Sequence, residues 1–429
     1  MGRLAPGAPA VARVVGGREL SASPLPSAGV SAAGIDVARA RAATPGCHDV
    51  VHLNNAGAAL PTRHVLDTVI DHLELEARVG GYAAADAVAD RSNAVYDSVA
   101  TLLGAHRDEI ALMESATRAW DMAFYAVAAR FEPGDVVVTS RSEYVSNALA
   151  FLQVARRTGL SVEVLPDDEH GAVDVDALRE RLERDPPVRL VAVSWIPTQG
   201  GLVNPAAAVG ALARAAGVPY LLDACQAVGQ LPVDVEALGC DFLSATGRKY
   251  LRAPRGTGLL YVRRPWIEAL DPPFVDVHAA RWTSDSSYEL RADARRFESF
   301  EHGVAGRLGL GAAVDEALAW GADAIATRVL ALGEALRGKL AAVPRLALRD
   351  LGQHRCGIVT FTIEGVDPFA LAAALRERHV NISVSTIDFA RLDFESRGLD
   401  AVARASVHYY NTDDELDRLV DEITSITRT

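Results

Sequence analysis

A lysine and an aspartate, each placed where an apolar segment ends, are the residues of this sequence best suited to chemistry. Asp223 closes the apolar run 218–222, and Lys249 follows a second apolar run, 242–246. A lysine amine can form a Schiff base with an aldehyde, and a carboxylate can keep a pyridine nitrogen protonated. These are the two groups that pyridoxal phosphate chemistry needs, so the pair predicts a site for that cofactor.

Short apolar runs alternate with helical patterns around this pair. The runs typical of buried strands are 135–139, 161–165, 190–194, 220–222 and 258–262, and helical patterns cover 173–182 and 205–216. Such alternation predicts an α/β domain whose parallel sheet is covered on both faces. Ligands bind beyond the carboxyl ends of such strands, where Ser194, Asp223 and Thr246 are expected.

The last third of the chain has a different pattern. A long helical stretch, about 304–340, leads into a smaller unit with strands at 357–362, 382–384 and 405–409. A helix is expected from Pro368 to Glu377, and a final helix begins near Thr412, whose hydroxyl can cap it. We predict a flexible extension over 1–47, a large domain over 48–290 and a small C-terminal domain over 291–429.

Composition and charge narrow the possible partners. Of 429 residues, 49% are hydrophobic and 23% are charged, which is ordinary for a globular protein. The net charge of −13 argues against nucleic acid or an anionic membrane surface as the main partner. The four cysteines are scattered, which suits a reducing cytoplasm. We predict no membrane span and no bound metal, because no apolar stretch is long enough and no histidines have ligand spacing.

Three segments carry a family resemblance. They are 223–229 (DACQAVG), 246–258 (TGRKYLRAPRGTG) and 404–411 (RASVHYYN). In order and spacing they resemble the class V aminotransferase family of pyridoxal-phosphate enzymes of fold type I. The resemblance covers about residue 53 to the C-terminus. It implies a large parallel-sheet domain with a smaller α+β C-terminal domain, pyridoxal 5'-phosphate as cofactor, an amino-acid substrate and a homodimer.

The resemblance also implies roles for individual residues. Lys249 matches the Schiff-base lysine and proton shuttle, and Asp223 the partner of the ring nitrogen; these two are the catalytic residues. Arg404 matches the arginine that binds the substrate carboxylate, with Asn55 as a second substrate contact. The implied cofactor-binding set is Lys249, Asp223, Gln226, Tyr144, Ala116, Thr117, Thr198, Thr246 and Arg248.

Within that set the resemblance separates two groups. Gln226 and Thr198 match residues near the cofactor's phenolic oxygen, although the family more often has asparagine at the second position. Tyr144 matches a ring that stacks on the pyridine. The phosphate is expected at the turn 113–117, where a helix N-terminus would face it, with further contacts from Thr246 and Arg248.

Two departures distinguish the chain from the cysteine desulfurases of this family. Those enzymes carry a nucleophilic cysteine before the arginine strand, whereas residues 382–394 contain none. They usually have histidine before the Schiff-base lysine, where this chain has Arg248. The string around Lys249 and the segment 80–82 (GGY) are closer to the ergothioneine-type C–S lyases. In addition, Glu301 stands where the family often has a threonine donated to the partner's phosphate.

These features favour a C–S lyase that acts by β-elimination on an S-substituted cysteine or cysteine S-conjugate. The runner-up is decarboxylation with oxidative deamination of such a conjugate, as in lincosamide-type antibiotic pathways. Transamination or epimerisation is possible on the same scaffold. A non-catalytic protein would have no use for Lys249 and Asp223 together. A Rossmann oxidoreductase is not supported, because no G-x-G-x-x-G segment follows a predicted strand.

Overall fold

The large sheet carries Asp223 and Thr246, two of the residues that were predicted to do chemistry, at the ends of its strands. A computed structural model describes residues 34–428 of the chain. The seven-stranded sheet has the spatial order β2 (Ile110–Met113), β8 (Gly258–Val262), β7 (Phe242–Thr246), β6 (Tyr220–Asp223), β5 (Val188–Ser194), β3 (Val136–Thr139) and β4 (Ser161–Val164). The predicted α/β class and a mostly parallel sheet are confirmed. The strand β8 is the exception, because it runs antiparallel to both of its neighbours.

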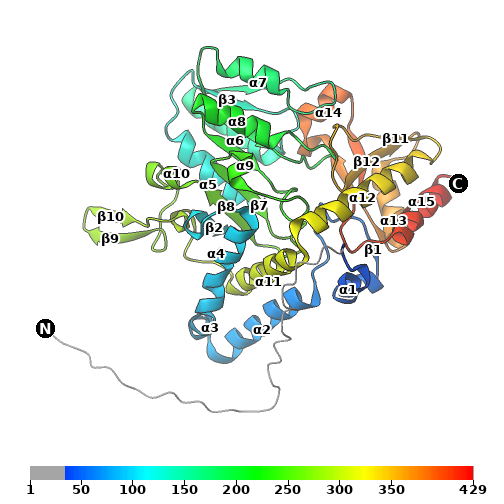
Figure 1. The fold of residues 1–429 in the computed structure, drawn as a ribbon, viewed down its shortest axis with the longest axis horizontal. Coiled ribbons are helices and arrows are strands. Elements are labelled where there is room, and N and C mark those ends of the chain that lie inside the picture. Colours follow the sequence, from blue (N-terminus) through cyan, green and yellow to red (C-terminus); the bar gives the residue numbers. More distant parts are fainter. Residues whose placement is uncertain (1–33, 429) are drawn as a thin grey trace. The chain divides into compact units, whose positions relative to one another are not determined.

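Helices cover both faces of this sheet (Figure 1). On β6, Leu221 belongs to one hydrophobic cluster with side chains of α5 and α6, whereas Leu222 belongs to another with side chains of α8. Neighbouring residues of a strand point to opposite faces, which explains why the strand sequences are apolar throughout. The helices of this region are α5 (Ala116–Ala128), α6 (Val145–Thr158), α7 (Val175–Leu182), α8 (Ala206–Ala216), α9 (Val235–Leu238) and α10 (Arg264–Ala269).

The C-terminal region forms a smaller antiparallel sheet flanked by helices. Its strands lie in the order β11 (Leu346–Leu348), β12 (Ile358–Ile363), β15 (Ala401–Ser406) and β14 (Ser383–Thr386). Its helices are α11 (Val304–Trp320), α12 (Ala322–Ala341), α13 (Pro368–Glu377), α14 (Arg391–Arg397) and α15 (Asp413–Thr427). The expected helix Pro368–Glu377 is confirmed, and the Thr412 hydroxyl caps α15 as predicted.

The remaining elements connect these two sheets. Before the large sheet come α1 (Val37–Ala42), η1 (Pro45–His48), β1 (Val51–His52), α2 (Arg63–Val79), α3 (Gly81–Ala87), α4 (Ala89–Leu103) and η2 (Arg107–Glu109). Between the sheets lie the hairpin β9 (Ala280–Ser284) and β10 (Ser287–Leu290) and η3 (Ala294–Phe297). Late in the chain β13 (Val380–Asn381) pairs with β1, and η4 (Ile387–Phe389) precedes α14.

Three element boundaries differ from the prediction. Residues 34–47, expected in a flexible extension, form α1 and η1, and Arg41 bonds Glu415 of α15 at 2.7 Å. The rest of that extension, 1–33, lies outside the described residues. The single helix expected over 304–340 is two helices, because Gly321 adopts a φ of +85° between them. The last strand ends at Ser406, since the backbone turns where His408 N donates to Asn411 Oδ1.

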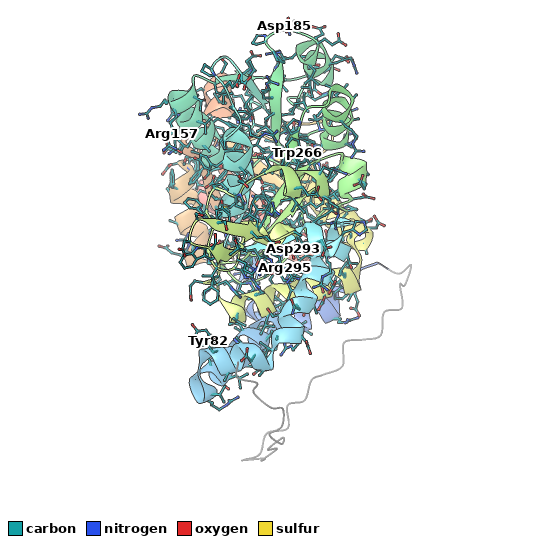
Figure 2. All side chains as sticks on the ribbon, turned by 90° about the vertical axis from the view of Figure 1, so that its left-hand side faces the viewer. Tyr82, Arg157, Asp185, Trp266, Asp293 and Arg295 are labelled. Atoms are coloured by element: carbon teal, nitrogen blue, oxygen red, sulfur yellow. The ribbon has the colours of Figure 1, made fainter. Side chains whose placement is uncertain are left out.

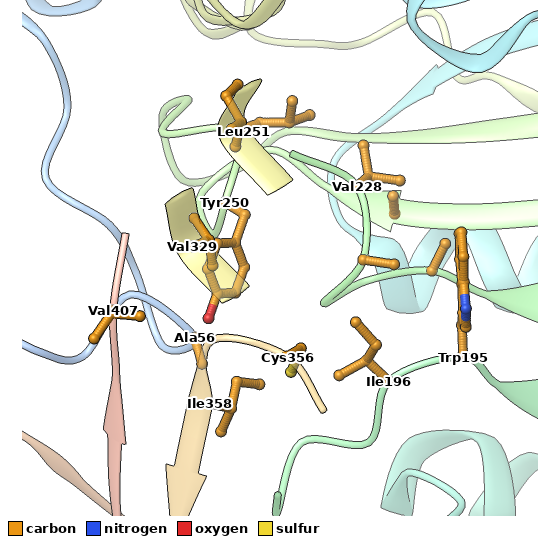
Figure 3. Close-up of a cluster of buried hydrophobic side chains, with 14 of the residues drawn as sticks. Ala56, Trp195, Ile196, Val228, Tyr250, Leu251, Val329, Cys356, Ile358 and Val407 are labelled. Atoms are coloured by element: carbon orange, nitrogen blue, oxygen red, sulfur yellow. The ribbon is translucent and has the colours of Figure 1, made fainter. Parts of the chain in front are cut away.

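A shared hydrophobic core joins the two sheets behind the predicted lysine. Figure 3 shows Tyr250, the residue after Lys249, packed near Val329 of α12 and Ile358 of β12. Cys356 and Ile196 lie in the same cluster. The described residues form one compact unit, so the predicted division at residue 290 stays a prediction. No helix among residues 34–428 is long and apolar enough to span a membrane.

Candidate active site

A cavity lies at the carboxyl ends of the central strands. Ser194, Asp223 and Thr246, the last residues of β5, β6 and β7, all line it, as the strand pattern predicted. The predicted cofactor-binding residues that line it are Ala116, Thr117, Tyr144, Thr198, Asp223, Gln226, Thr246, Arg248 and Lys249.

The side-chain amine of Lys249 forms no ion pair with the described residues. Its side chain follows β7 in a turn closed by the Arg252 N–H, which donates to the Lys249 carbonyl oxygen. The Nζ atom lies 3.3 Å from Cys225 Sγ, and no carboxylate of the described residues is within ion-pair distance. Lys249 is only 8% exposed. A sheltered amine whose nearest partner is a thiol is available to react with a carbonyl group.

Asp223 is held in one orientation by two donors. The Cys225 N–H donates to its Oδ1 at 2.9 Å, and Asn147 Nδ2 donates to its Oδ2 at 3.0 Å. Burial raises the pKa of the carboxyl group, while these hydrogen bonds and the charge of Lys249 oppose that rise. A fixed, buried carboxylate of this kind is well suited to bind a protonated ring nitrogen.

The N-terminus of α5 lies at one end of the cavity. Ser115 caps this helix by accepting from the Arg118 N–H at 3.1 Å, and Ala116 and Thr117 form its first turn. Gly258 of β8 lets the strand approach closely, because a Cβ there would lie 2.6 Å from the Ser115 backbone. Free amide groups and the helix dipole favour a phosphate at such a position.

Gln226 and Tyr144 complete the walls of the cavity. Gln226 Nε2 donates to the Ala56 carbonyl at 3.1 Å, but its Oε1 is buried without a partner among the described atoms. An unsatisfied amide end in a cavity indicates that a ligand completes its hydrogen bonding. Tyr144 immediately precedes α6 and is half-buried, and burial raises the pKa of its phenol. Tyr144 also lines the cavity, where an aromatic ring can stack on a flat ligand.

Arg404 is a buried cation that has no carboxylate partner among residues 34–428. Its Nη1 donates to the Thr198 carbonyl at 2.6 Å and to Thr198 Oγ1 at 3.0 Å, and its Nε donates to Ser383 Oγ at 3.0 Å. Burial lowers its pKa to about 10, and the neighbouring charge of Arg248 acts in the same direction. Because a buried charge without a counter-ion is costly, this arrangement fits the carboxylate of a bound substrate.

Thr198, Arg248 and Asn55 have contacts that sequence reasoning did not foresee. Thr198 lines the cavity, but its hydroxyl accepts from Arg404. Arg248 Nη1 donates to the Gly57 carbonyl while still lining the cavity.

Neither of the two predicted substrate-binding residues, Arg404 and Asn55, lines the cavity, and their substrate contacts stay predictions. Asn55 is fully buried, its Nδ2 donates to the Ser406 carbonyl at 2.7 Å, and its Oδ1 accepts from the Tyr410 hydroxyl at 2.5 Å. These contacts satisfy the amide inside the protein. Tyr82 of the 80–82 segment is also absent from the lining and is 82% exposed (Figure 2).

Three residues of the cavity region were not predicted to have roles. Cys225 lines the cavity beside Lys249, and Asn147 lines it beside Asp223. Glu143 does not line the cavity but accepts a hydrogen bond from Asn147. For Glu143 and Asn147 the sequence signal was a mostly polar segment, 140–147, that follows the apolar strand β3. No cluster of three or more potential metal-ligating side chains occurs among residues 34–428.

The residues present fit an aromatic aldehyde that carries a phosphate. The cavity offers an unpaired amine, a fixed carboxylate, a helix N-terminus and an amide with an unsatisfied oxygen. These match the aldehyde, ring nitrogen, phosphate and phenolic oxygen of such a molecule in turn. The fit depends on side chains from five different segments that the fold brings to one edge of the sheet.

The chain is similar in sequence to known proteins of one family. The model of the family "Aminotransferase class-V" matches residues 51–419. A probable cysteine desulfurase of Xylella fastidiosa (strain 9a5c) is 31% identical over 77% of this chain and 79% of its own length. The cysteine desulfurase of Dickeya dadantii (strain 3937) is 35% identical over 70% of this chain and 71% of its own.

Solved structures share the fold. The cysteine desulfurase CsdA from Escherichia coli superposes with a TM-score of 0.85 at 25% identity, covering 92% of this chain and 99% of its own. The cystine C-S lyase C-DES, in complex with its product cysteine persulfide, gives a TM-score of 0.79 at 20% identity, covering 89% and 99%. The second likeness concerns the fold alone.

Proposed function

This chain belongs to the aminotransferase class-V family, and from that premise we propose that it is a pyridoxal-phosphate-dependent enzyme that cleaves the C–S bond of a cysteine-type amino acid. The observation that carries the proposal is the cavity in which Lys249, Asp223 and the α5 N-terminus meet beside the uncompensated Arg404. The relatives named cysteine desulfurase support a cysteine-type substrate.

Three side chains have tasks in this reaction: Asp223 and Lys249 line the cavity, and Arg404 lies beside it, in contact with the lining residue Thr198. Bound pyridoxal phosphate supplies an aldehyde for the substrate amine and a ring that accepts electrons from the α-carbon. Asp223 keeps the proton on the ring nitrogen. Arg404 binds the substrate carboxylate and so orients the α-carbon toward Lys249. Lys249 Nζ, displaced by the substrate amine, removes the α-proton and later donates a proton to a leaving group.

We propose further that the substrate is an S-substituted cysteine and that the reaction is a β-elimination of the lyase type. The Cβ–S bond breaks, the sulfur substituent leaves as a thiol, and water converts the three-carbon fragment to pyruvate and ammonia. This route needs no protein nucleophile. It therefore agrees with the absence of cysteine from 382–394, where the family's desulfurases carry theirs.

Product analysis tests this reaction. The purified protein, incubated with a panel of cysteine S-conjugates, is expected to release pyruvate, ammonia and the free thiol in equal amounts. Carbon dioxide release with oxygen consumption would instead identify decarboxylation with oxidative deamination, and an amino-group transfer or an inverted α-carbon would identify transamination or epimerisation. A substrate recovered unchanged under all these conditions would contradict the proposal.

Cys225 supports a second candidate, a desulfurase that stores sulfur as a persulfide. Among the described residues, Cys225 is the one cysteine that lines the cavity. Relatives of the chain are also named cysteine desulfurases. However, burial raises the pKa of this thiol, which keeps it protonated and weakly nucleophilic at neutral pH. The neighbouring Cys356 is fully buried in the core and offers no alternative (Figure 3).

A Cys225→Ser variant separates the two candidates. For the lyase we expect kcat to stay within about threefold of wild type, because the hydroxyl can still accept from Lys249 and no sulfur passes through the side chain. For the desulfurase, activity on cysteine would be lost. Mass spectrometry of the wild-type protein after turnover gives the independent check, since a persulfide on Cys225 would identify the desulfurase. Cys240→Ser serves as the control, because that thiol is buried elsewhere.

We also propose that the enzyme is a homodimer, as the family resemblance implies. Large apolar side chains are exposed on the segment 274–288, including Phe274 at 60%, Val277 at 77%, Trp282 at 79% and Tyr288 at 56%. Such a concentration of apolar surface favours an interface over contact with water. The hairpin β9–β10, which carries Trp282 and Tyr288, extends from the side of the large sheet in Figure 1.

Trp282→Asp is expected to dissociate the dimer. Removal of a central aromatic contact typically costs about 2 kcal/mol or more, which raises the dimer Kd by at least about 30-fold. Light scattering during gel filtration over a range of concentrations measures the effect. Phe369→Asp, an exposed apolar position on α13, is the control and should leave the mass unchanged. A wild-type monomer, or a variant that remains dimeric, would contradict this interface.

A further inference from the structure

A buried polar network joins the cofactor-binding carboxylate to a second carboxylate that the reaction does not use. Asn147 Nδ2 donates both to Asp223 Oδ2 at 3.0 Å and to Glu143 Oε1 at 2.9 Å. All three side chains are almost inaccessible, with exposures of 2% for Asn147, 8% for Asp223 and 3% for Glu143. One amide group therefore bridges two buried acids.

Glu143 is itself held rigidly. Its Oε1 also accepts from the Tyr144 N–H at 2.7 Å and from Ser194 Oγ at 2.7 Å. Its Oε2 accepts from Thr139 Oγ1 at 2.9 Å. With four donors on one carboxyl group, the side chain cannot rotate without losing several buried hydrogen bonds.

The network connects the ends of three adjacent strands. Thr139 ends β3, Ser194 ends β5 and Asp223 ends β6, and Ser194 pairs directly with Asp223 across the sheet. Glu143 lies on the turn between β3 and α6, beside the ring-stacking candidate Tyr144. A single side chain thus fixes the backbone of Tyr144 and the amide that holds Asp223.

We propose that Glu143 and Asn147 are positioning residues for cofactor binding: Asn147 fixes the orientation of Asp223 and keeps it anionic, and Glu143 fixes Asn147 while reinforcing the negative charge on the ring-nitrogen side of the cavity. This inference rests on the proposed function, because it assigns the partner of Asp223 as a protonated ring nitrogen. Neither residue needs to touch the substrate or the cofactor.

The charges of the two acids are coupled. Two carboxylates bridged by one amide repel each other strongly when both are ionised in a buried site. Burial raises the pKa of Glu143 to about 7, and the charge of Asp223 contributes to that rise. The other titratable groups close to the pair are Tyr220 of β6, Cys225 after β6, Tyr144 and Lys249. Glu143 therefore adds a negative charge beside Asp223 as the pH rises through about 7.

The pH dependence of cofactor affinity tests this assignment. Pyridoxal phosphate is titrated into the apo-forms of the wild type, Asn147→Ala and Glu143→Gln between about pH 5 and pH 9, with the visible band of the bound cofactor as the readout. Loss of a hydrogen bond to a charged group should raise the Kd of Asn147→Ala about tenfold at neutral pH. The pKa of Asp223 should also rise, so the acid-side loss of binding should begin at a higher pH than in the wild type.

Glu143→Gln should change the cofactor affinity on the alkaline side of the pH profile rather than on the acid side. Glu143 is already protonated at low pH, so the variant should bind like the wild type there. Above about pH 7 it lacks the second negative charge and should bind more weakly than the wild type. A merely structural role predicts instead that both variants lower affinity by a constant factor at every pH. That result, or affinities equal to those of the wild type, would overturn the inference.

Two further variants keep the test interpretable. Gln153 lies on α6, as Asn147 does, and Gln153→Ala removes only an exposed contact with Tyr125 of α5, so it should leave the profile unchanged. If Asn147→Ala does not fold, Asn147→Ser retains one donor and should give an affinity between the wild type and a tenfold loss, with the same displacement of the acid side. A wild-type protein that binds no pyridoxal phosphate would refute the proposed function itself, whereas normal wild-type binding with unaltered variants refutes only this inference.

Discussion

Lys249→Ala is expected to lower kcat for C–S cleavage by at least about 10⁴-fold, the upper end of what a positioned acid–base group contributes. The variant loses both the amine that holds the cofactor and the base that removes the α-proton. No second amine can replace it, because the cavity is lined by no other lysine among the described residues. Pyruvate release from a cysteine S-conjugate measures the loss.

Covalent trapping provides the structural check on this prediction. Borohydride treatment of the wild-type holoenzyme should leave the reduced cofactor on the peptide that contains Lys249, and the variant should carry no such label. Lys339→Ala is the matched control, since Lys339 is a solvent-accessible lysine of α12 paired with Asp417. A label on another lysine, or more than about a hundredth of wild-type activity in Lys249→Ala, would contradict the assignment.

The strand ends could be predicted because burial on both faces leaves a strong mark in the sequence. Continuous apolar runs located β5, β6 and β7, and the polar residues that terminate them, Ser194, Asp223 and Thr246, all line the cavity. The antiparallel direction of β8 left no such mark, because an apolar run has the same appearance in either direction. The break between α11 and α12 at Gly321 was missed because Ala- and Leu-rich helical sequence continues on both sides of it.

The hydrogen-bonding partners of the site could not be predicted in the same way. Asn147 meets Asp223 only because α6 begins beside the end of β6, and that proximity is a property of the folded sheet. The hydrogen bonds of Asn55 with the Ser406 carbonyl and the Tyr410 hydroxyl likewise join residues about 350 positions apart in the chain. Sequence motifs therefore located most of the residues that gather in the cavity, whereas the groups that orient them required the tertiary structure.

Arg404→Ala is expected to lower kcat/KM by about 10²- to 10³-fold, mostly through KM. The guanidinium of the wild type is held by Thr198 and Ser383 with no carboxylate nearby, so a substrate carboxylate would be its counter-ion. Arg404→Lys should recover part of the loss, because the ammonium keeps the charge but cannot form a planar two-point contact. Steady-state kinetics with a cysteine S-conjugate and with its decarboxylated amine analogue measure the contribution, since the analogue should be insensitive to both substitutions.

Stability measurements distinguish a substrate-binding arginine from a structural one. Arg337 is equally buried but is paired with Asp350 at 2.7 Å, so Arg337→Ala leaves a buried carboxylate uncompensated and should cost about 3–5 kcal/mol of unfolding free energy. Arg404→Ala removes a buried charge that has no carboxylate partner in the described chain, so it should leave the apo-protein about as stable as the wild type or slightly more stable. Denaturant unfolding of the apo-proteins makes the comparison. Equal destabilisation by the two substitutions would show that Arg404 supports the fold, and the kinetic defect would then need another explanation.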